Sequence, residues 1–254
     1  MNHISLKSIF LFFLVLSSFS CENVLEEEIV IYNNDFSTAD LNSIENGRLF
    51  VFNGDTVLGY YNDEEVLLNL ASLPKHNTIK VTIDLLLHDS WDGNPENVGG
   101  PDYWYLELDG QSVLHTTFSN SPCESTYCLY QSYPANYPRF NEPKTEALRT
   151  DLPGRCQYKN SNGWTSLYRI TKIISHKSNQ LSITLGDDLK QENTPEPICD
   201  ESWSVSSIQV STLTINWIRH EQKAPFLFTN YLLGMFYLFD FPNKGSVAKH
   251  RIEL

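Results

Sequence analysis

Positive charge is scarce in this sequence, which has 18 Lys and Arg residues against 31 Asp and Glu residues among its 254 positions. The formal net charge of −13 argues against nucleic-acid binding, because contacts to phosphates require clustered Lys and Arg. The sequence also lacks heptads, internal repeats, low-complexity tracts and any amphipathic helix pattern with caps. These absences exclude a coiled coil and a repeat array. They leave an acidic chain whose length suits one domain with a sizeable core.

Several motifs of catalysis and metal binding are also missing. The cysteines lack the CxxC spacing of common zinc sites, the serines lack a GxSxG nucleophile elbow, and the acidic residues do not follow the spacing of an EF-hand loop. The sequence therefore favours a binding protein over an enzyme, although a hydrolase remains an alternative.

The N-terminal segment 1–20 has the pattern of a secretory signal peptide. Lys7 precedes an apolar core over residues 9–16 that is too short to span a membrane, and small residues follow. The ending Ser-Phe-Ser-Cys resembles a bacterial lipobox, with Ser20 directly before Cys21 and a serine where the common pattern has leucine. The resemblance implies lipidation of Cys21 and an extracytoplasmic lipoprotein held on the outer membrane or cell surface. The alternative is ordinary signal cleavage, which would leave Cys21 as a free thiol.

Outside the cytoplasm the remaining cysteines become candidates for disulfide bonds. Cys123, Cys128, Cys156 and Cys199 permit three pairings. Cys123 and Cys128 are close enough in sequence to close a small loop, and Cys156 and Cys199 could join two distant loops. A zinc site is the rival interpretation.

The middle of the chain predicts short strands, because apolar and polar residues alternate and Gly, Pro, Asn or Asp lie between the runs. In the run 103–110, Trp104, Leu106 and Leu108 share one face, which is the better core candidate. Strands at this spacing indicate an all-β, antiparallel jelly-roll β-sandwich. The predicted strands cover residues 48–54, 64–70, 78–87, 103–110, 167–174, 179–186 and 202–210.

The same region resembles a recurrent module of secreted bacterial proteins over residues 47–210. The resemblance rests on the motifs LPKH, DSWDGN, GPDYW, TTFSN and DESW. It implies a jelly roll of the concanavalin, laminin-G or MAM type, and it implies no particular activity. One departure is the pair Ser206 and Ser207, where the module has Asp-Asn.

These observations divide the chain into four predicted segments. They are a signal peptide at 1–20, an acidic tether and first strand region at 21–46, a β-sandwich domain at 47–214, and a C-terminal apolar extension at 215–254. The apolar run in the extension is about 17 residues long, which is shorter than the ~20 residues that a spanning helix needs.

Oxygen-bearing side chains crowd the segment after the strand 78–87. Calcium takes six to eight oxygen ligands, so this loop is a candidate calcium site. The alternative is a network of Asx turns in which the side chains cap their own backbone, with Trp91 packed over the turn. The candidate ligands are Asp89, Asp92, Asn94 and Asp102, joined by Asp200 and Glu201 if the last strand returns beside them.

Aromatic residues next to this loop suggest a binding surface. Trp91, Tyr103 and Tyr105 are the candidates for stacking on a glycan or a cell-surface protein, and the alternative for most aromatic residues here is packing in the core and loops. Glu107 and Asp109 alternate on the same strand and could be the carboxylates of a glycan-cleaving hydrolase. A third hypothesis is a structural surface lipoprotein without a small ligand.

Overall fold

The computed structural model describes residues 21–96, 100–189 and 194–219. Its contacts divide the chain into a unit spanning Leu25–Asn216 and a second unit of Met1–Val24 with Trp217–Leu254. The account below concerns the first unit. The predicted signal peptide and residues 220–254 of the predicted extension lie outside the described residues.

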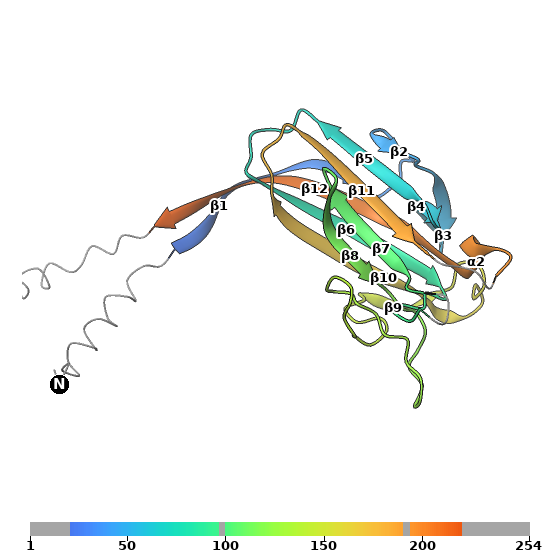
Figure 1. Ribbon diagram of the computed structural model, residues 1–254. Coiled ribbons are helices and arrows are strands. Elements are labelled where there is room, and N and C mark those ends of the chain that lie inside the picture. Colours follow the sequence, from blue (N-terminus) through green and yellow to red (C-terminus); the bar gives the residue numbers. More distant parts are fainter. Residues whose placement is uncertain (1–20, 97–99, 190–193, 220–254) are drawn as a thin grey trace, which may run out of the picture. The chain divides into compact units, whose positions relative to one another are not determined.

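Two antiparallel sheets form a β-sandwich (Figure 1), which confirms the predicted fold class. The first sheet has the order β3 (Leu49–Phe52), β4 (Asp55–Tyr61), β12 (Glu201–Arg219), β6 (Thr78–Asp89), β10 (Asn162–Ser175) and β9 (Arg149–Pro153), and β1 (Cys21–Asn34) also pairs with β12. The second sheet has the order β2 (Ile44–Glu45), β5 (Glu65–Ala71), β11 (Gln180–Asp188), β7 (Tyr103–Leu108) and β8 (Gln111–Thr117). One helical turn, α2 (Pro197–Asp200), precedes β12. The chain passes repeatedly between the sheets, as in a jelly roll.

The core lies between the two sheets and follows from the alternation of each strand. Each inward aliphatic side chain that is fully buried contributes about 1.5–3 kcal/mol. The predicted core face of β7 is confirmed, because Trp104, Leu106 and Leu108 are buried. The opposing residues of β6 are Val81, Ile83, Leu85 and Leu87, which are at most 1% exposed.

All seven predicted strands are present. The structure also contains further strands, among them β4 and β8, that the alternation pattern did not predict. Asn53 and Gly54 form the two-residue turn between β3 and β4, and Asp109 and Gly110 form the turn between β7 and β8. All four residues have positive φ, which is the conformation that Asn-Gly and Asp-Gly hairpin turns require. Of the strands that follow these turns, β4 contains a glycine and β8 contains many polar residues. Neither sequence therefore shows a clear alternation of apolar and polar residues.

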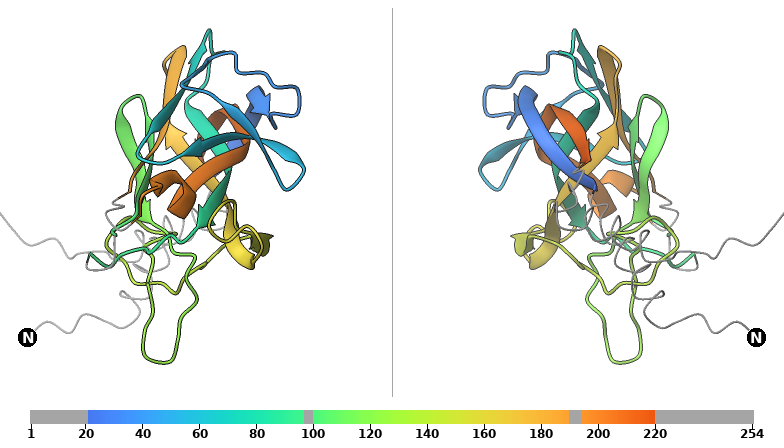
Figure 2. Two further views of the ribbon diagram at one scale, coloured as in Figure 1. Left: turned by 90° about the vertical axis from the view of Figure 1, so that its right-hand side faces the viewer. Right: turned by 90° about the vertical axis from the view of Figure 1, so that its left-hand side faces the viewer.

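The four cysteines form two disulfide bonds, Cys123–Cys128 and Cys156–Cys199. Cys123–Cys128 closes a small loop within residues 118–148, the long connection between β8 and β9. In Figures 1 and 2 this yellow-green segment extends beyond the ends of the strands. The prediction of disulfides is confirmed, including the local and the long-range pair.

Among the described residues, no helix has the length and apolar character needed to cross a membrane.

Candidate functional site

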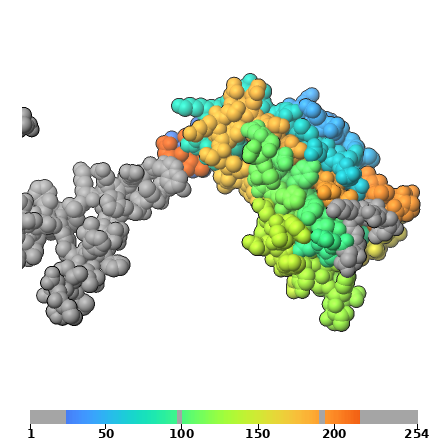
Figure 3. Space-filling model, in the orientation of Figure 1, coloured from blue at the N-terminus to red at the C-terminus, as the bar shows by residue number. Residues whose placement is uncertain are grey.

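The outer face of the second sheet carries the predicted ligand-binding residues Tyr103 and Tyr105. Because the alternate residues of β7 point into the core, Tyr103, Tyr105 and Glu107 point outward and are partly exposed. Figure 3 shows this face, on which β5 (cyan), β11 (gold) and the β7–β8 hairpin (green) follow one another. We call this surface the tyrosine face; it is defined by Tyr103, Tyr105, Glu107, His115, Tyr137 and Glu65.

A row of rings forms the centre of the tyrosine face. His115 on β8 lies opposite Tyr105 in the ladder, and the Tyr103 and His115 ring centroids are 4.6 Å apart. The Tyr105 and His115 rings are stacked at 6.4 Å with an interplanar angle of 21°. Tyr137, from the long connection, stands at 87° to Tyr103 with a centroid distance of 5.1 Å. Its backbone N–H donates to the His115 carbonyl (2.8 Å), so this upright ring is fixed to the edge of the sheet.

Tyr105 lies flat across the neighbouring strand because β11 has a glycine there. A Cβ atom on Gly186 would lie 2.4 Å from the Tyr105 ring, so any other residue would displace the ring. In this position the Tyr105 hydroxyl donates to Glu65 Oε1 on β5 (2.6 Å). Gly186 pairs with both Glu65 and Tyr105 in the ladder, so the contact runs straight across three strands.

Carboxylates lie near both tyrosines of the tyrosine face and affect their pKa values. Burial raises the pKa of Tyr103 to about 12, and Tyr137, Glu96 and Asp188 add to the increase. Burial also raises the pKa of Tyr105, and the hydrogen bond and charge of Glu65 and the charge of Glu107 act in the same direction. Both phenols therefore stay protonated at neutral pH, and the Tyr105 hydroxyl uses its proton in the hydrogen bond to Glu65.

A depression of about 420 Å³ adjoins this face at Glu65. Arg48 lines this depression. Its Cζ atom lies 4.4 Å from the centroid of the Tyr61 ring, and its side chain forms an ion pair with Glu64. The positive charge at this border is therefore matched by an adjacent carboxylate.

Trp91 lies elsewhere, and the prediction that it binds a ligand needs correction. Its side chain is 0% exposed, and its indole N–H donates to the Ser202 carbonyl (3.0 Å). Its ring packs edge-on against Phe118 in the core. The ring therefore offers no surface to a ligand and is part of the core.

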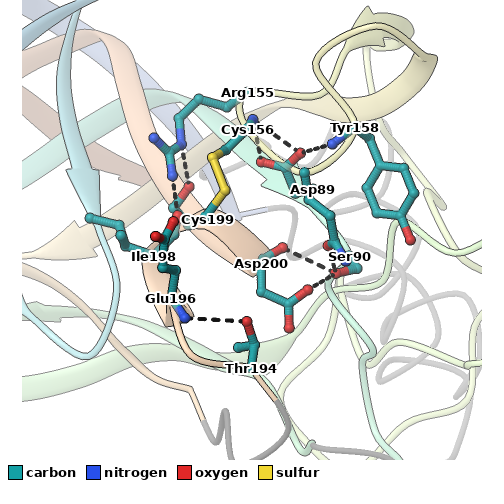
Figure 4. The surroundings of a disulfide bond; sticks show 12 residues. Asp89, Ser90, Arg155, Cys156, Tyr158, Thr194, Glu196, Ile198, Cys199 and Asp200 are labelled. Atoms are coloured by element: carbon teal, nitrogen blue, oxygen red, sulfur yellow. Dashed lines mark hydrogen bonds between the residues drawn. A yellow bond between two sulfur atoms is a disulfide. The ribbon is translucent and has the colours of Figure 1, made fainter.

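Two of the four predicted calcium ligands are engaged by the protein itself. The Asp89 carboxylate accepts the backbone N–H groups of Cys156 (3.0 Å) and Tyr158 (3.0 Å), so it organises the loop beside the Cys156–Cys199 disulfide (Figure 4). The Asn94 side chain accepts from Ser132 Oγ (2.8 Å) and donates to the Arg139 carbonyl. The partners of Asp89 and Asn94 lie in distant loops, so these contacts tie loops together and are not the local caps that the Asx-turn alternative predicts.

The other two predicted ligands, Asp92 and Asp102, lie close together. Asp102 Oδ2 accepts the backbone N–H groups of Asp92 and Gly93, the latter at 3.0 Å, whereas the buried Oδ1 has no hydrogen-bond partner among the described residues. Burial and the charge of Asp92 raise the pKa of Asp102 well above its usual range. Burial, followed by the charge of Asp200, raises the pKa of Asp92 to about 6.

The last strand does return beside this loop, since Glu201 pairs with Asp89 in the ladder. However, β6 and β7 belong to different sheets, so the loop spans the sandwich instead of joining adjacent strands. Within the described ranges, no three His, Cys, Asp or Glu side chains are grouped so as to hold a metal ion. Calcium binding stays a prediction.

The two predicted hydrolase carboxylates have different environments. Glu107 lies on the tyrosine face, whereas Asp109 occupies the hairpin turn and accepts the Ser182 N–H (2.9 Å). Asp109 Oδ2 also lies 3.1 Å from His176 Nε2, and His176 Nδ1 lies 2.7 Å from His76 Nε2. Asp109 is thus held by structural contacts, which does not favour a role as an acid or nucleophile.

Sequence reasoning did not assign Glu65, His115, Tyr137 and Gly186 to the site. They come from three other strands and a long connection, so only strand pairing brings them beside Tyr103 and Tyr105. The one available signal was Tyr137, which belongs to a segment rich in Tyr and Pro.

No family model matches the sequence, and no curated protein matches it. Among solved structures, the chain is similar to a family GH115 4-O-methyl-α-glucuronidase with specificity for decorated arabinogalactans (8% identity, 72% of this chain and 17% of that chain, TM-score 0.37). It is also similar to a family 35 carbohydrate-binding module from Clostridium thermocellum (10% identity, 74% and 97%, TM-score 0.32). A third similar structure is an exo-β-1,3-galactanase from Phanerochaete chrysosporium (9% identity, 75% and 27%, TM-score 0.27).

These likenesses are too distant to assign a family or a ligand. The chain's own fold and side chains define its class: a disulfide-bonded, all-β sandwich with a row of aromatic rings on the outer face of one sheet.

Proposed function

We propose that this protein binds a glycan outside the cytoplasm, and that the tyrosine face is its binding site. The observation that carries the proposal is the Tyr103–His115–Tyr105 row, which is partly exposed on the sheet and bordered by the upright Tyr137 ring. Aromatic rings offer large, rigid contact area at low entropic cost, which suits stacking against the apolar face of a sugar.

Polar groups beside the rings supply the directional contacts. Glu65 and Glu107 provide carboxylate oxygens that accept hydrogen bonds from sugar hydroxyls. Tyr105 is already oriented by Glu65, so little side-chain entropy is lost when a ligand stacks on it.

The proposed location rests on the disulfides and the N-terminal segment. Two disulfides are typical of oxidising compartments. The lipobox-like sequence before Cys21 supports a lipid anchor, which would hold the module on a membrane surface. A cell-surface protein is the alternative ligand.

A glycan array followed by calorimetry tests the proposed site. Tyr103→Ala and Tyr137→Ala should each weaken binding of an array hit about tenfold, which corresponds to the loss of one ring contact. Tyr127→Ala is the matched control, because Tyr127 is 50% exposed but lies in the small disulfide loop away from the ring row. Equal affinities for all four proteins would place the glycan elsewhere, and an empty array would argue against glycan binding.

A further inference from the structure

Charge is divided unequally between the two sheets. The strands of the second sheet contain no Lys or Arg, and their outward acidic residues are Glu45, Glu65, Glu107 and Asp188. The first sheet, in contrast, contains basic residues. On β6, β9 and β10 these are Lys80, Arg149, Arg169 and Lys172. The strands that carry the tyrosine face therefore combine aromatic rings with carboxylates and contain no Lys or Arg.

Two acidic side chains flank Tyr105, one at its hydroxyl and one along its own strand. Glu65 receives the Tyr105 hydroxyl from across β11, and Glu107 follows Tyr105 by two residues, which is about 7 Å along a strand. Glu45 lies beyond Glu65, where it accepts from Asn69 Nδ2 (2.7 Å). A sugar that stacks on Tyr105 thus has carboxylates within reach on two sides.

We propose that the glycan bound by the tyrosine face carries amines, as in a polymer of unacetylated glucosamine residues. This inference rests on the proposed function and names its ligand class. The ring row provides the stacking surface, and Glu65 and Glu107 pair with the ammonium groups. An anionic glycan would be repelled by the same carboxylates, and a neutral one would gain hydrogen bonds from them but no charge attraction.

The electrostatics of the two phenols agree with this assignment. Burial is the main cause of the raised pKa of Tyr103 and of Tyr105, and nearby carboxylates add to both increases, so negative charge lies close to each hydroxyl. The charge of Arg48, which lines the depression beside Glu65, is matched by Glu64.

The test uses two ligands that differ only in acetylation: a β-1,4-linked glucosamine hexamer and its N-acetylated counterpart. Calorimetry is carried out on the whole protein in mildly acidic buffer, in which the amines are charged, at low and at high salt. We expect the glucosamine hexamer to bind at least about fivefold more tightly, and we expect high salt to remove the preference, because exposed ion pairs are screened.

Charge-removing variants identify the residues responsible. Glu65→Gln and Glu107→Gln keep the size of each side chain, and each should weaken binding of the glucosamine hexamer roughly threefold more than binding of the N-acetylated hexamer, because only the glucosamine hexamer loses a charge attraction. The control is Asp55→Asn, which removes an exposed carboxylate from β4 in the other sheet and should change neither affinity. Matched melting curves verify that all variants are folded.

The outcomes separate this inference from the proposed function. Equal or tighter binding of the N-acetylated hexamer, without salt dependence, overturns the amine assignment and leaves glycan binding intact. No binding of either hexamer also overturns the amine assignment, whereas glycan binding itself is overturned only if the glycan array is empty as well.

Discussion

Asp187 allows a quantitative test of how burial controls the stability of this sandwich. It lies at the end of β11 and is 4% exposed. Its Oδ1 accepts the Trp203 indole N–H (2.7 Å) and the Glu64 backbone N–H (3.1 Å), and its Oδ2 accepts the Asp63 backbone N–H. Burial nevertheless dominates these bonds and raises the pKa of Asp187 from 3.8 to about 6.

The sign of the pH dependence follows from this direction. Because the folded pKa lies above the unfolded pKa, the folded state retains its proton while the unfolded state has lost it. The contribution of Asp187 to the free energy of unfolding is fully present below about pH 4 and is lost as the pH rises through about 6. A difference of about two pH units corresponds to about 3 kcal/mol in total, of which about 2 kcal/mol is lost between pH 4.5 and 8.

Asp187→Asn removes this titration. Urea unfolding at pH 4.5 and at pH 8 gives the change in the free energy of unfolding with pH for the wild type and for the variant. Subtracting one change from the other gives a double difference, in which the pH-independent effect of the amide on stability cancels. The buried Asp89, Asp92 and Asp102 are present in both proteins and cancel as well. We expect the variant to gain about 2 kcal/mol relative to the wild type as the pH rises.

The control variant is Asp55→Asn, which replaces an exposed carboxylate at the β3–β4 turn and should leave the double difference near zero. A double difference near zero for Asp187→Asn, or one of opposite sign, would refute the reasoning that burial outweighs the three donated hydrogen bonds.

Four further predictions follow from individual residues. Labelled palmitate should enter the wild-type protein and not Cys21→Ala, and equal labelling would exclude a lipid on that cysteine. Replacing Cys156 and Cys199 together by serine should cost about 4 kcal/mol in urea unfolding, because the bridge closes a loop with a sequence separation of 43, and an unchanged midpoint would contradict this. Calcium at a hundredfold excess over its Kd should add about 2.7 kcal/mol to the wild type and nothing to Asp92→Ala, whereas identical melting with calcium and with chelator would leave the loop as a capped turn. Gly186→Ala should displace the Tyr105 ring and weaken glycan binding about tenfold, and an unchanged affinity would remove that ring from the site.

The sequence by itself determined the class of fold and much of its local structure. Period-two alternation located the strands and the inward face of β7, because that face depends only on which side of the strand is apolar. Asn53-Gly54 and Asp109-Gly110 carry the hairpin signal in their residue types, since few other pairs adopt positive φ easily. Cysteine spacing was enough to suggest a local bridge between Cys123 and Cys128.

Only the tertiary structure decided which residues face solvent at the site. Trp91 and Tyr105 are both aromatic residues near the same loop, yet one is buried against Ser202 and the other lies on the open sheet. Asp89 resembles a metal ligand in sequence, but a loop more than sixty residues away supplies its N–H donors. Alternation specifies a side of one strand and does not specify which distant segment covers that side. The assembly of Glu65, His115 and Tyr137 around Tyr105 therefore depends on strand pairing and sheet order, which are set by the packing of the whole core.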